Sequence, residues 1–303
     1  LPRYAPMVSR LPFIANLRNT VPGLAKLTEK ITGFTATRDL PVWRTRPFKN
    51  EEADKDDDPQ VVLFADCFNR YFEPENLRAT LKVLDAANVG CHVAAAPAGE
   101  RPLCCGRTFL SAGLVEEART EAKRLVDALL PYAEKGLPIV GLEPSCLLTL
   151  RDEIPGLLPG KDTELLAKEA RMLEEYIADQ KDNEDFNLPL KSPAPKVLLH
   201  GHCHQKAMDV MSSIEHTLSL LPDTEVDVVE TSCCGMAGSF GYKAETYALS
   251  LAVAEDSLGD EMAAARATGC DVVAPGVSCR HQMHDVFAVD ARHPATLLAA
   301  ALR

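Results

Sequence analysis

Eight of the ten cysteines in this 303-residue chain fall into two sets of four that follow the same order. In each set a lone cysteine comes first, a Cys-Cys-Gly sequence follows, and another lone cysteine completes the set. The first set is Cys67, Cys104, Cys105 and Cys146, and the second is Cys203, Cys233, Cys234 and Cys279. Four thiolates are a frequent ligand set for iron-sulfur clusters and for structural zinc. The pattern predicts one or two iron-sulfur clusters, of the 4Fe-4S type, with zinc as the alternative.

The adjacent cysteine pairs argue against two other interpretations. Structural zinc sites usually take ligands from Cys-x₂₋₄-Cys pairs, a spacing that this sequence lacks. Neighbouring cysteines are also poor disulfide partners, because their side chains diverge. Gly106 and Gly235, which follow the pairs, permit a tight turn that brings backbone N–H groups close to sulfur.

Strands and helices alternate along the sequence on both sides of a polar, proline-rich stretch at 180–196. Short apolar runs predict strands, and apolar residues at helical spacing predict helices. The predicted strands are 61–66, 92–96, 138–143, 197–201, 226–230 and 271–274. The predicted helices are 75–88, 114–129, 206–220 and 243–257. This alternation predicts parallel sheets with helices on their faces.

An internal duplication accounts for the two sets. Shifting VVLFADC at 61–67 by 136 positions places it on VLLHGHC at 197–203, with Cys67 on Cys203. We therefore predict an α/β fold made of two duplicated, doubly wound, Rossmann-like halves, each with its own Cys-Cys-Gly motif. All eight cysteines follow predicted strands, so each set should meet at the carboxyl edge of a sheet. Cys91 and Cys270 precede strands and are expected at the opposite edges, as buried apolar residues.

The charge distribution divides the chain further. The net charge of −12 argues against a nucleic-acid partner, because phosphate binding needs a basic face. Residues 1–50 nevertheless carry nine Lys/Arg against two acidic residues. We predict a basic arm and acidic linker at 1–59, a first domain at 60–180 and a second at 196–303. The arm is expected to lie on its own acidic domain, with an anionic membrane or a partner protein as the alternative.

An apolar stretch lies within this arm, and the same two alternatives apply to it: contact with the protein itself, or contact with a partner or membrane. It could form an amphipathic helix that docks on a partner or membrane, but packing on the first half is the default expectation. The stretch comprises Leu11, Phe13, Ile14, Leu17, Val21, Leu24 and Leu27.

Three alternating histidines surround the first cysteine of the second set. His200, His202 and His204 could supply a cluster ligand, as in Rieske centres, but hydrogen bonding near the site or a structural role is the default expectation. Lys206, Arg280 and His281 could offset cluster charge and are ranked below the cysteines. No secretory signal is visible, so we expect a cytoplasmic protein, with peripheral attachment to the inner face of the cytoplasmic membrane as a further option.

Five segments resemble the cysteine-rich CCG domains of iron-sulfur oxidoreductases. They are RPLCCGRTFLSAG (101–113), GLEPSC (141–146), HGHCHQKAM (200–208), ETSCCGMAGSFG (230–241) and GVSCRHQ (276–282). This family includes the cysteine-rich subunit of heterodisulfide reductase and the iron-sulfur subunits of glycerol-3-phosphate, glycolate and lactate oxidation. The chain looks most like the C-terminal part of bacterial FAD-linked oxidases that act on D-2-hydroxy acids such as D-lactate, glycolate or D-2-hydroxyglutarate.

This resemblance implies a chain that passes electrons from a flavin to a quinone or another acceptor. It also implies an FAD-binding dehydrogenase part and a ferredoxin-like iron-sulfur domain as partners. Residues 1–66 hold neither a cysteine nor a glycine-rich nucleotide motif, so FAD is expected on another polypeptide or an absent portion. The heterodisulfide reductase form ends each repeat in Cys-x-x-Cys, which is missing after Cys146 and Cys279. Four ligands per site are therefore expected, and thiol/disulfide reduction is a third functional alternative.

Overall fold

Alternate residues of the strand β1 (Val61–Leu63) enter two different buried clusters. Val61 and Leu63 belong to one cluster, and Val62 belongs to another on the opposite face. A strand that is buried on both faces is typical of parallel sheets covered by helices. The computed structural model, which describes residues 1–53, 58–231 and 233–303, has two such sheets.

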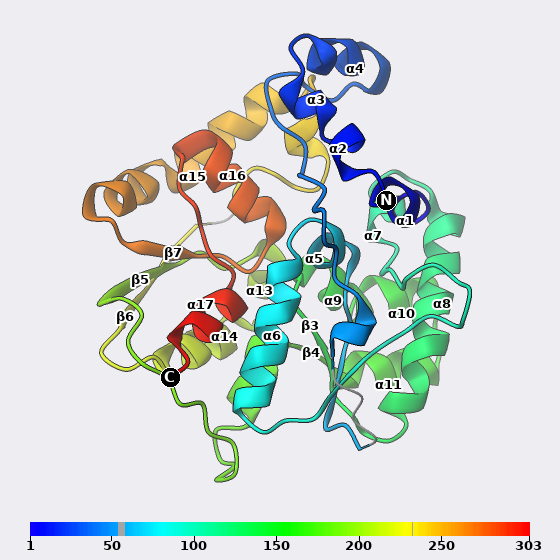
Figure 1. Ribbon diagram of the computed structural model, residues 1–303, viewed down its shortest axis with the longest axis vertical. Helices are drawn as coiled ribbons and strands as arrows, with labels where there is room; N and C mark the ends of the chain where they lie inside the picture. The colour runs from blue at the N-terminus through cyan, green and yellow to red at the C-terminus, as the bar shows by residue number, and fades with distance from the viewer. Residues whose placement is uncertain (54–57, 232) are drawn as a thin grey trace.

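Both sheets are parallel throughout. The first has the order β2 (Cys91–Val93), β1, β3 (Ile139–Gly141) and β4 (Ala170–Met172). The second has the order β6 (Glu225–Val228), β5 (Lys196–Leu199) and β7 (Asp271–Val273). Figure 1 shows the second sheet on the left and the first in the lower centre. The predicted α/β fold with duplicated parallel-sheet halves is confirmed, although β4 was not predicted.

Helices connect these strands and cover their faces (Figure 1). In the first half they are α5 (Cys67–Tyr71), α6 (Pro74–Ala86), α7 (Arg107–Leu110), α8 (Val115–Ala133), α9 (Pro144–Leu147), α10 (Glu153–Leu157), α11 (Lys161–Glu169) and α12 (Leu173–Asp179). In the second half they are α13 (Cys203–Ala207), α14 (Met211–Ser219), α15 (Tyr247–Thr268), α16 (Val277–Phe287) and α17 (Pro294–Ala301).

Two helix predictions in the second half needed correction. The single helix predicted at 206–220 is two helices, α13 and α14, because Asp209 between them adopts a left-handed backbone with φ of 55°. The helix predicted at 243–257 begins later and runs to Thr268, where Gly269 ends it in a left-handed conformation with φ of 68°.

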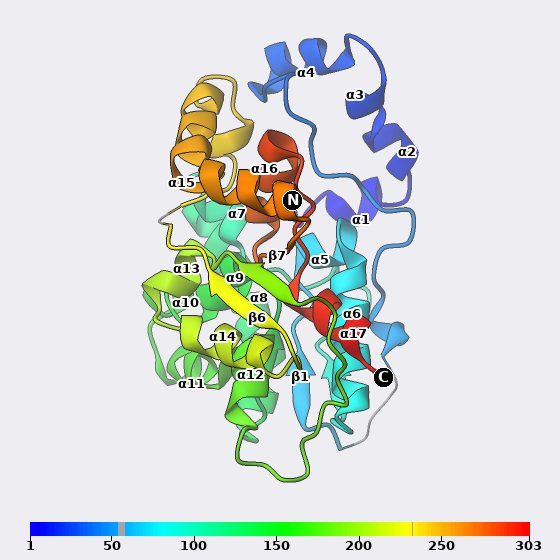
Figure 2. The ribbon, with the colours of Figure 1, turned by 90° about the vertical axis from the view of Figure 1, so that its left-hand side faces the viewer.

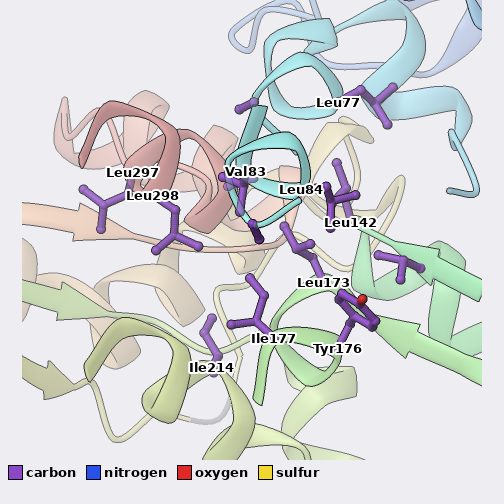
Figure 3. Packing of buried hydrophobic residues seen from close by; sticks show 14 of the residues in the cluster. Leu77, Val83, Leu84, Leu142, Leu173, Tyr176, Ile177, Ile214, Leu297 and Leu298 are labelled. Carbon is purple, nitrogen blue, oxygen red and sulfur yellow. The ribbon is translucent and has the colours of Figure 1, made fainter. Parts of the chain in front are cut away.

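The two halves share one hydrophobic core. Val61 and Leu63 of the first sheet lie in the same buried cluster as Val197 and Leu199 of the second. Figure 3 shows how helices from both halves meet there. Its side chains include Leu84 of α6, Leu173 and Ile177 of α12, Ile214 of α14, and Leu297 and Leu298 of α17. The C-terminal helix α17 thus packs on α6 of the first half.

The N-terminal arm does not form the expected amphipathic helix. It forms four short helices, α1 (Ala5–Val8), α2 (Pro12–Ala15), α3 (Leu17–Thr20) and α4 (Leu24–Thr32), which lie along one end of the molecule (Figure 2). Gly23, with φ of 84°, separates the last two. The expectation that its apolar side chains pack on the first half is wrong for most of them. Leu24 is half-buried, and the following side chains are exposed: Leu11, Phe13, Ile14, Leu17, Val21 and Leu27.

Among the described residues, no helix combines the length and apolar character needed to cross a bilayer. The described part also leaves out Ser232 of the ETSCCGMAGSFG motif and residues 54–57 of the acidic linker.

Candidate metal centres

Equivalent cysteines occupy equivalent helix positions in the two halves. Cys67 and Cys203 are the first residues of α5 and α13, each directly after the loop that leaves a central strand. Cys146 and Cys279 are the third residues of α9 and α16. The carboxyl edge of each sheet thus presents cysteines at helix N-termini, as the strand-end argument predicted.

The first set forms a continuous group of buried thiols. Hydrogen bonds between thiols link Cys67 to Cys104, Cys104 to Cys105, and Cys105 to Cys146. All four side chains are at most 4% exposed and lie in one hydrophobic cluster. The structure therefore brings together, in a dry pocket, the four residues that the sequence singled out. A buried tetrad of thiols suits a metal centre closed to solvent.

Hydrogen bonding within the first set favours ionisation of one thiol. Bonds from Cys105 and Cys67 hold the pKa of Cys104 well below its usual range. The same bonds to Cys104 contribute most to raising the pKa of Cys67 and of Cys105. For Cys146, the hydrogen bond with Cys105 is the largest influence and lowers the pKa, but burial together with the nearby charges of Asp66, Glu143 and Cys104 outweighs it and raises the pKa to about 12. A metal ion would have to displace these protons, since thiolates are the ligating form.

Both Cys-Cys-Gly turns have the same geometry. Gly106 and Gly235 adopt left-handed conformations with φ of 81° and 83°. Their N–H groups donate to the sulfur two residues earlier, Cys104 at 3.5 Å and Cys233 at 3.3 Å. A Cβ on Gly235 would lie 2.5 Å from the Ser250 carbonyl oxygen. The predicted reason for glycine, a tight turn with N–H groups near sulfur, is confirmed at both positions.

The second set is more open than the first. Hydrogen bonds link Cys234 to Cys233 and to Cys279, and Cys234 and Cys279 are buried. Cys233 is half-buried and Cys203 is exposed. The Cys203 thiol lies 3.9 Å from His202 Nδ1. Cys234 therefore joins Cys233 and Cys279, and the fourth cysteine, Cys203, lies at the surface beside a histidine.

The histidines around Cys203 have defined partners. The His200 ring lies 3.3 Å from the Thr231 hydroxyl, and His202 Nδ1 accepts a hydrogen bond from the His204 backbone at the start of α13. Burial lowers the pKa of His200 to about 4 and that of His202 to about 3, so both are neutral near pH 7. Ligand atoms of His202, Cys203 and His204 lie within 4.8 Å of one another. This geometry could hold a metal ion.

Residues beside the two sets contact each other across the junction between the halves. Ser145 Oγ, next to Cys146, lies 3.3 Å from His202 Nε2, next to Cys203. The buried Glu143 carboxylate accepts a hydrogen bond of 2.9 Å from Val277 N, near Cys279. Burial raises the pKa of Glu143 to about 7. The helices α5, α9 and α13 accordingly lie near one another in the middle of the molecule in Figure 1.

Two arginine side chains reach across this junction, one in an ion pair and one in a hydrogen-bond contact. Arg280, which follows Cys279, pairs with Glu73 at the start of α6. Arg107, which follows Gly106, lies 3.0 Å from His204 Nε2. The two candidate centres therefore face one another and do not lie at opposite ends of the protein.

Sequence reasoning missed Arg38, an arm residue that holds the second set in place. Its guanidinium group donates 2.8 Å hydrogen bonds to the Gly241 carbonyl and the Met236 sulfur, and it pairs with Asp285 at 3.0 Å. It also bonds to the Gln282 side chain at 2.5 Å. These partners come from the loop after Cys234 and from α16, which carries Cys279. An arginine in a basic arm gives no sequence signal for this role.

Cys91 and Cys270 lie at the amino ends of β2 and β7, opposite to the two sets, as predicted. The prediction that they are buried is wrong, because both are half-buried. The reason is that β2 and β7 are edge strands.

A family model described as a cysteine-rich domain matches the chain twice, at residues 61–151 and 197–284. One subunit of the anaerobic glycerol-3-phosphate dehydrogenase of Escherichia coli K12 is 31% identical over 248 residues, which are 80% of this chain and 59% of that protein. D-2-hydroxyglutarate dehydrogenase of Pseudomonas putida is 28% identical over 96% of this chain and 25% of its own length. Lactate utilization protein A of Bacillus velezensis is 27% identical over 61% of this chain and 75% of its own length.

The chain thus spans less than two thirds of the first two of these relatives, so their complete activities are not transferred to it. The two family matches nevertheless cover more than half of its residues, and each contains one Cys-Cys-Gly turn. The chain belongs to the CCG cysteine-rich domain family and carries two copies of that domain.

Proposed function

We propose that this chain is the iron-sulfur electron-transfer part of an FAD-linked dehydrogenase of 2-hydroxy acids such as D-lactate, glycolate or D-2-hydroxyglutarate. The buried tetrad of Cys67, Cys104, Cys105 and Cys146 carries the proposal. In the proposed enzyme, a flavin on a partner domain or subunit supplies electrons, and a quinone or another acceptor receives them. A ferredoxin-like domain is the second proposed partner. Two of the three relatives are named for hydroxyglutarate or lactate, which are 2-hydroxy acids, and these names support the substrate class. The third is named for glycerol-3-phosphate, which is not a hydroxy acid, and it supports only a dehydrogenase component.

The residues of the first set fit a 4Fe-4S cluster. They offer four thiols, a backbone N–H aimed at sulfur, and apolar walls. Such a cluster would supply reversible one-electron transfer, while the protein sets its potential through hydrogen bonds to sulfur and burial. Cys203, Cys233, Cys234 and Cys279 are the proposed ligands of a second, more exposed centre.

The test is anaerobic purification followed by analysis of iron, acid-labile sulfide and zinc. About four irons per filled site, with an electron paramagnetic resonance signal after dithionite reduction, would support the proposal. If one of the three hydroxy acids reduces the clusters of the native enzyme and the same signal appears, the result would support the substrate class. A colourless protein without iron would refute it.

Zinc binding is the second candidate, because His202, Cys203 and His204 place ligand atoms close together. A zinc-stabilised interaction module would contain stoichiometric zinc and no sulfide. A thiol/disulfide reductase is the third candidate, supported by the exposed Cys203 thiol. It predicts loss of activity on alkylation of Cys203 while any bound metal is retained.

We place the protein in the cytoplasm, because reducing compartments keep thiols free to bind metals. Peripheral attachment to the inner face of the cytoplasmic membrane is the finer alternative. Cell fractionation with a salt wash distinguishes a soluble protein from one released from membranes.

A further inference from the structure

The first part of the arm, residues 1–32, presents its apolar side chains to solvent. Of the fifteen large hydrophobic side chains that are exposed among the described residues, nine lie between Tyr4 and Ile31. Met7 is 68% exposed, Phe13 65% and Ile31 76%. Clustered exposed apolar residues of this kind mark interaction sites.

Two polar side chains of this stretch, Asn16 and Arg18, point inward and tie it to residues 35–43, where the Trp43 ring packs 4.6 Å from the Phe72 ring of the first half. Asn16 exchanges hydrogen bonds of 3.0 and 2.9 Å with the Trp43 backbone. Arg18 is buried and donates to the Thr35 carbonyl at 2.6 Å. These two anchors hold the stretch, while its large apolar side chains stay exposed. The outward face is therefore held in place before any partner binds.

Charge restricts what can cover this face. Residues 1–32 carry five Lys/Arg and a single acidic residue, Glu29. The Glu29 carboxylate accepts a hydrogen bond from the Ala36 N–H, which satisfies it within the arm. Arg3, Arg10, Lys26 and Lys30 are exposed. The complementary surface is apolar with acidic residues around it.

The arm also lies beside the first cysteine set. Ala5 of α1 is fully buried in the same cluster as Cys67 and Cys104. The Arg3 guanidinium lies 5.0 Å from the centre of the Phe109 ring in α7, the helix that follows Gly106. Figure 1 shows α1 next to α7. A protein seated on α1 and α2 would therefore lie close to the buried tetrad.

The relatives favour a protein as the occupant. The Pseudomonas putida match covers 96% of this chain, so the uncovered 4% is about 12 of 303 residues and most of the arm is included. That dehydrogenase is about four times as long as the matched region, because the match covers 25% of it. The arm thus accompanies the two cysteine-rich domains in a relative with much additional protein.

We propose that the outward face of residues 1–32 is the docking surface for the electron-donating, flavin-bearing part of the dehydrogenase. Electrons enter at the first set beneath this face and leave through the second set, where Cys203 is exposed. The inference rests on the proposed function and adds the contact surface and the direction of transfer.

The test uses the native enzyme purified through a tag on this chain. The double variant Phe13→Ser/Leu27→Ser should slow reduction of the clusters by hydroxy acid at least tenfold. Its iron content and its reduction by dithionite should stay at wild-type levels. The matched control is Leu220→Ser/Val228→Ser, which removes two exposed apolar side chains outside the arm and should have no effect.

Charge and proximity are tested separately. Lys26→Glu/Lys30→Glu should slow the same reduction, whereas Lys135→Glu/Lys181→Glu should not. Amine cross-linking should join Lys26 or Lys30 to peptides of the flavin-bearing part outside residues 1–303. Wild-type reduction rates in both arm variants, or absence of these cross-links, would overturn the inference.

Two further outcomes would assign the face to other occupants and also overturn the inference. One is sedimentation of the wild-type chain with phosphatidylglycerol vesicles that the Phe13→Ser/Leu27→Ser variant abolishes. The other is a dimer in analytical ultracentrifugation that the same variant dissociates. If hydroxy acids fail to reduce even the wild-type enzyme, the proposed function fails, and the cross-links still decide the surface.

Discussion

The cysteines show how differently two copies of one motif can be exposed. The first tetrad is buried and fully linked by hydrogen bonds, whereas the second leaves Cys203 at the surface. Exposure governs both the potential of a cluster and its access to solvent. The two centres should therefore differ in potential and in sensitivity to oxygen, with the second lost first on exposure to air.

Single substitutions should separate the centres. Cys105→Ser should remove about half of the bound iron by emptying the first site, and Cys234→Ser should empty the second and leave the first intact. Each should eliminate a different part of the electron paramagnetic resonance signal. Cys91→Ser, outside both sets, is the control and should retain all iron. Unchanged iron in either ligand variant would falsify the assignment of that set.

A buried carboxyl group gives a prediction about pH. Glu174 in α12 is fully buried; its own backbone N–H lies nearby, but no other described residue donates to its carboxyl. Burial raises its pKa from 4.5 to about 7. The unfolded chain ionises this group at lower pH than the folded chain does, so the group lowers stability as pH rises from 4.5 to 7.

Glu174→Gln should remove this loss of folding stability at rising pH, because glutamine does not ionise. We expect the variant to gain roughly 3 kcal/mol over the wild type at pH 8 and little at pH 4.5, following the conversion of pKa shift to free energy. Thermal denaturation at both pH values measures the difference. Glu164→Gln, an exposed glutamate on α11, is the control. An equal gain at both pH values would contradict the titration argument.

The cysteine positions could be predicted because a ligand that follows a parallel strand must lie at the carboxyl edge of the sheet. The partners of His202 and His204 could not be predicted, because these partners, Ser145 and Arg107, belong to the other half of the chain. No local pattern reports a contact made across 57 or 97 positions. The sequence does contain the alternating histidines, which pointed to this region without fixing their roles.

At the scale of elements, predictions succeeded where periodicity was strong. The helix predicted at 75–88 is α6, Pro74–Ala86. The strand β4 was missed because its three residues lie between the helices α11 and α12 in a helix-favouring sequence, and only pairing with β3 extends them. The arm helices were misjudged because an apolar spacing does not reveal whether the apolar face is covered.

The arm should also control the second centre through Arg38. Removing one partner of a buried ion pair costs about 3 to 5 kcal/mol. Arg38→Gln should therefore lower the melting temperature and the iron content of the second site, since both segments that carry Cys234 and Cys279 lose their link. Arg46→Gln, an exposed arm arginine, is the control. Full iron content and an unchanged melting temperature in Arg38→Gln would exclude this role.

At the scale of the whole molecule, the duplication does not produce two independent units. The repeat is visible in the sequence, but the shared core is not, because it depends on contacts between residues far apart in the chain. The central cluster takes side chains from both sheets, and the helix α17 packs on α6 of the first half. This sharing holds the two cysteine sets in a fixed relation across the junction.

A substitution in α17 should therefore affect both halves. Leu298 is fully buried in the shared cluster (Figure 3), and Leu→Ala at such sites costs about 2 to 5 kcal/mol. Leu298→Ala should speed native-state hydrogen exchange in β1 and β3 of the first sheet as much as in β5 and β7 of the second. Leu220→Ala, at an exposed position, should change neither. Faster hydrogen exchange in the second sheet alone would mean that each half holds its metal centre independently. The shared core would then not explain the fixed relation between the two centres.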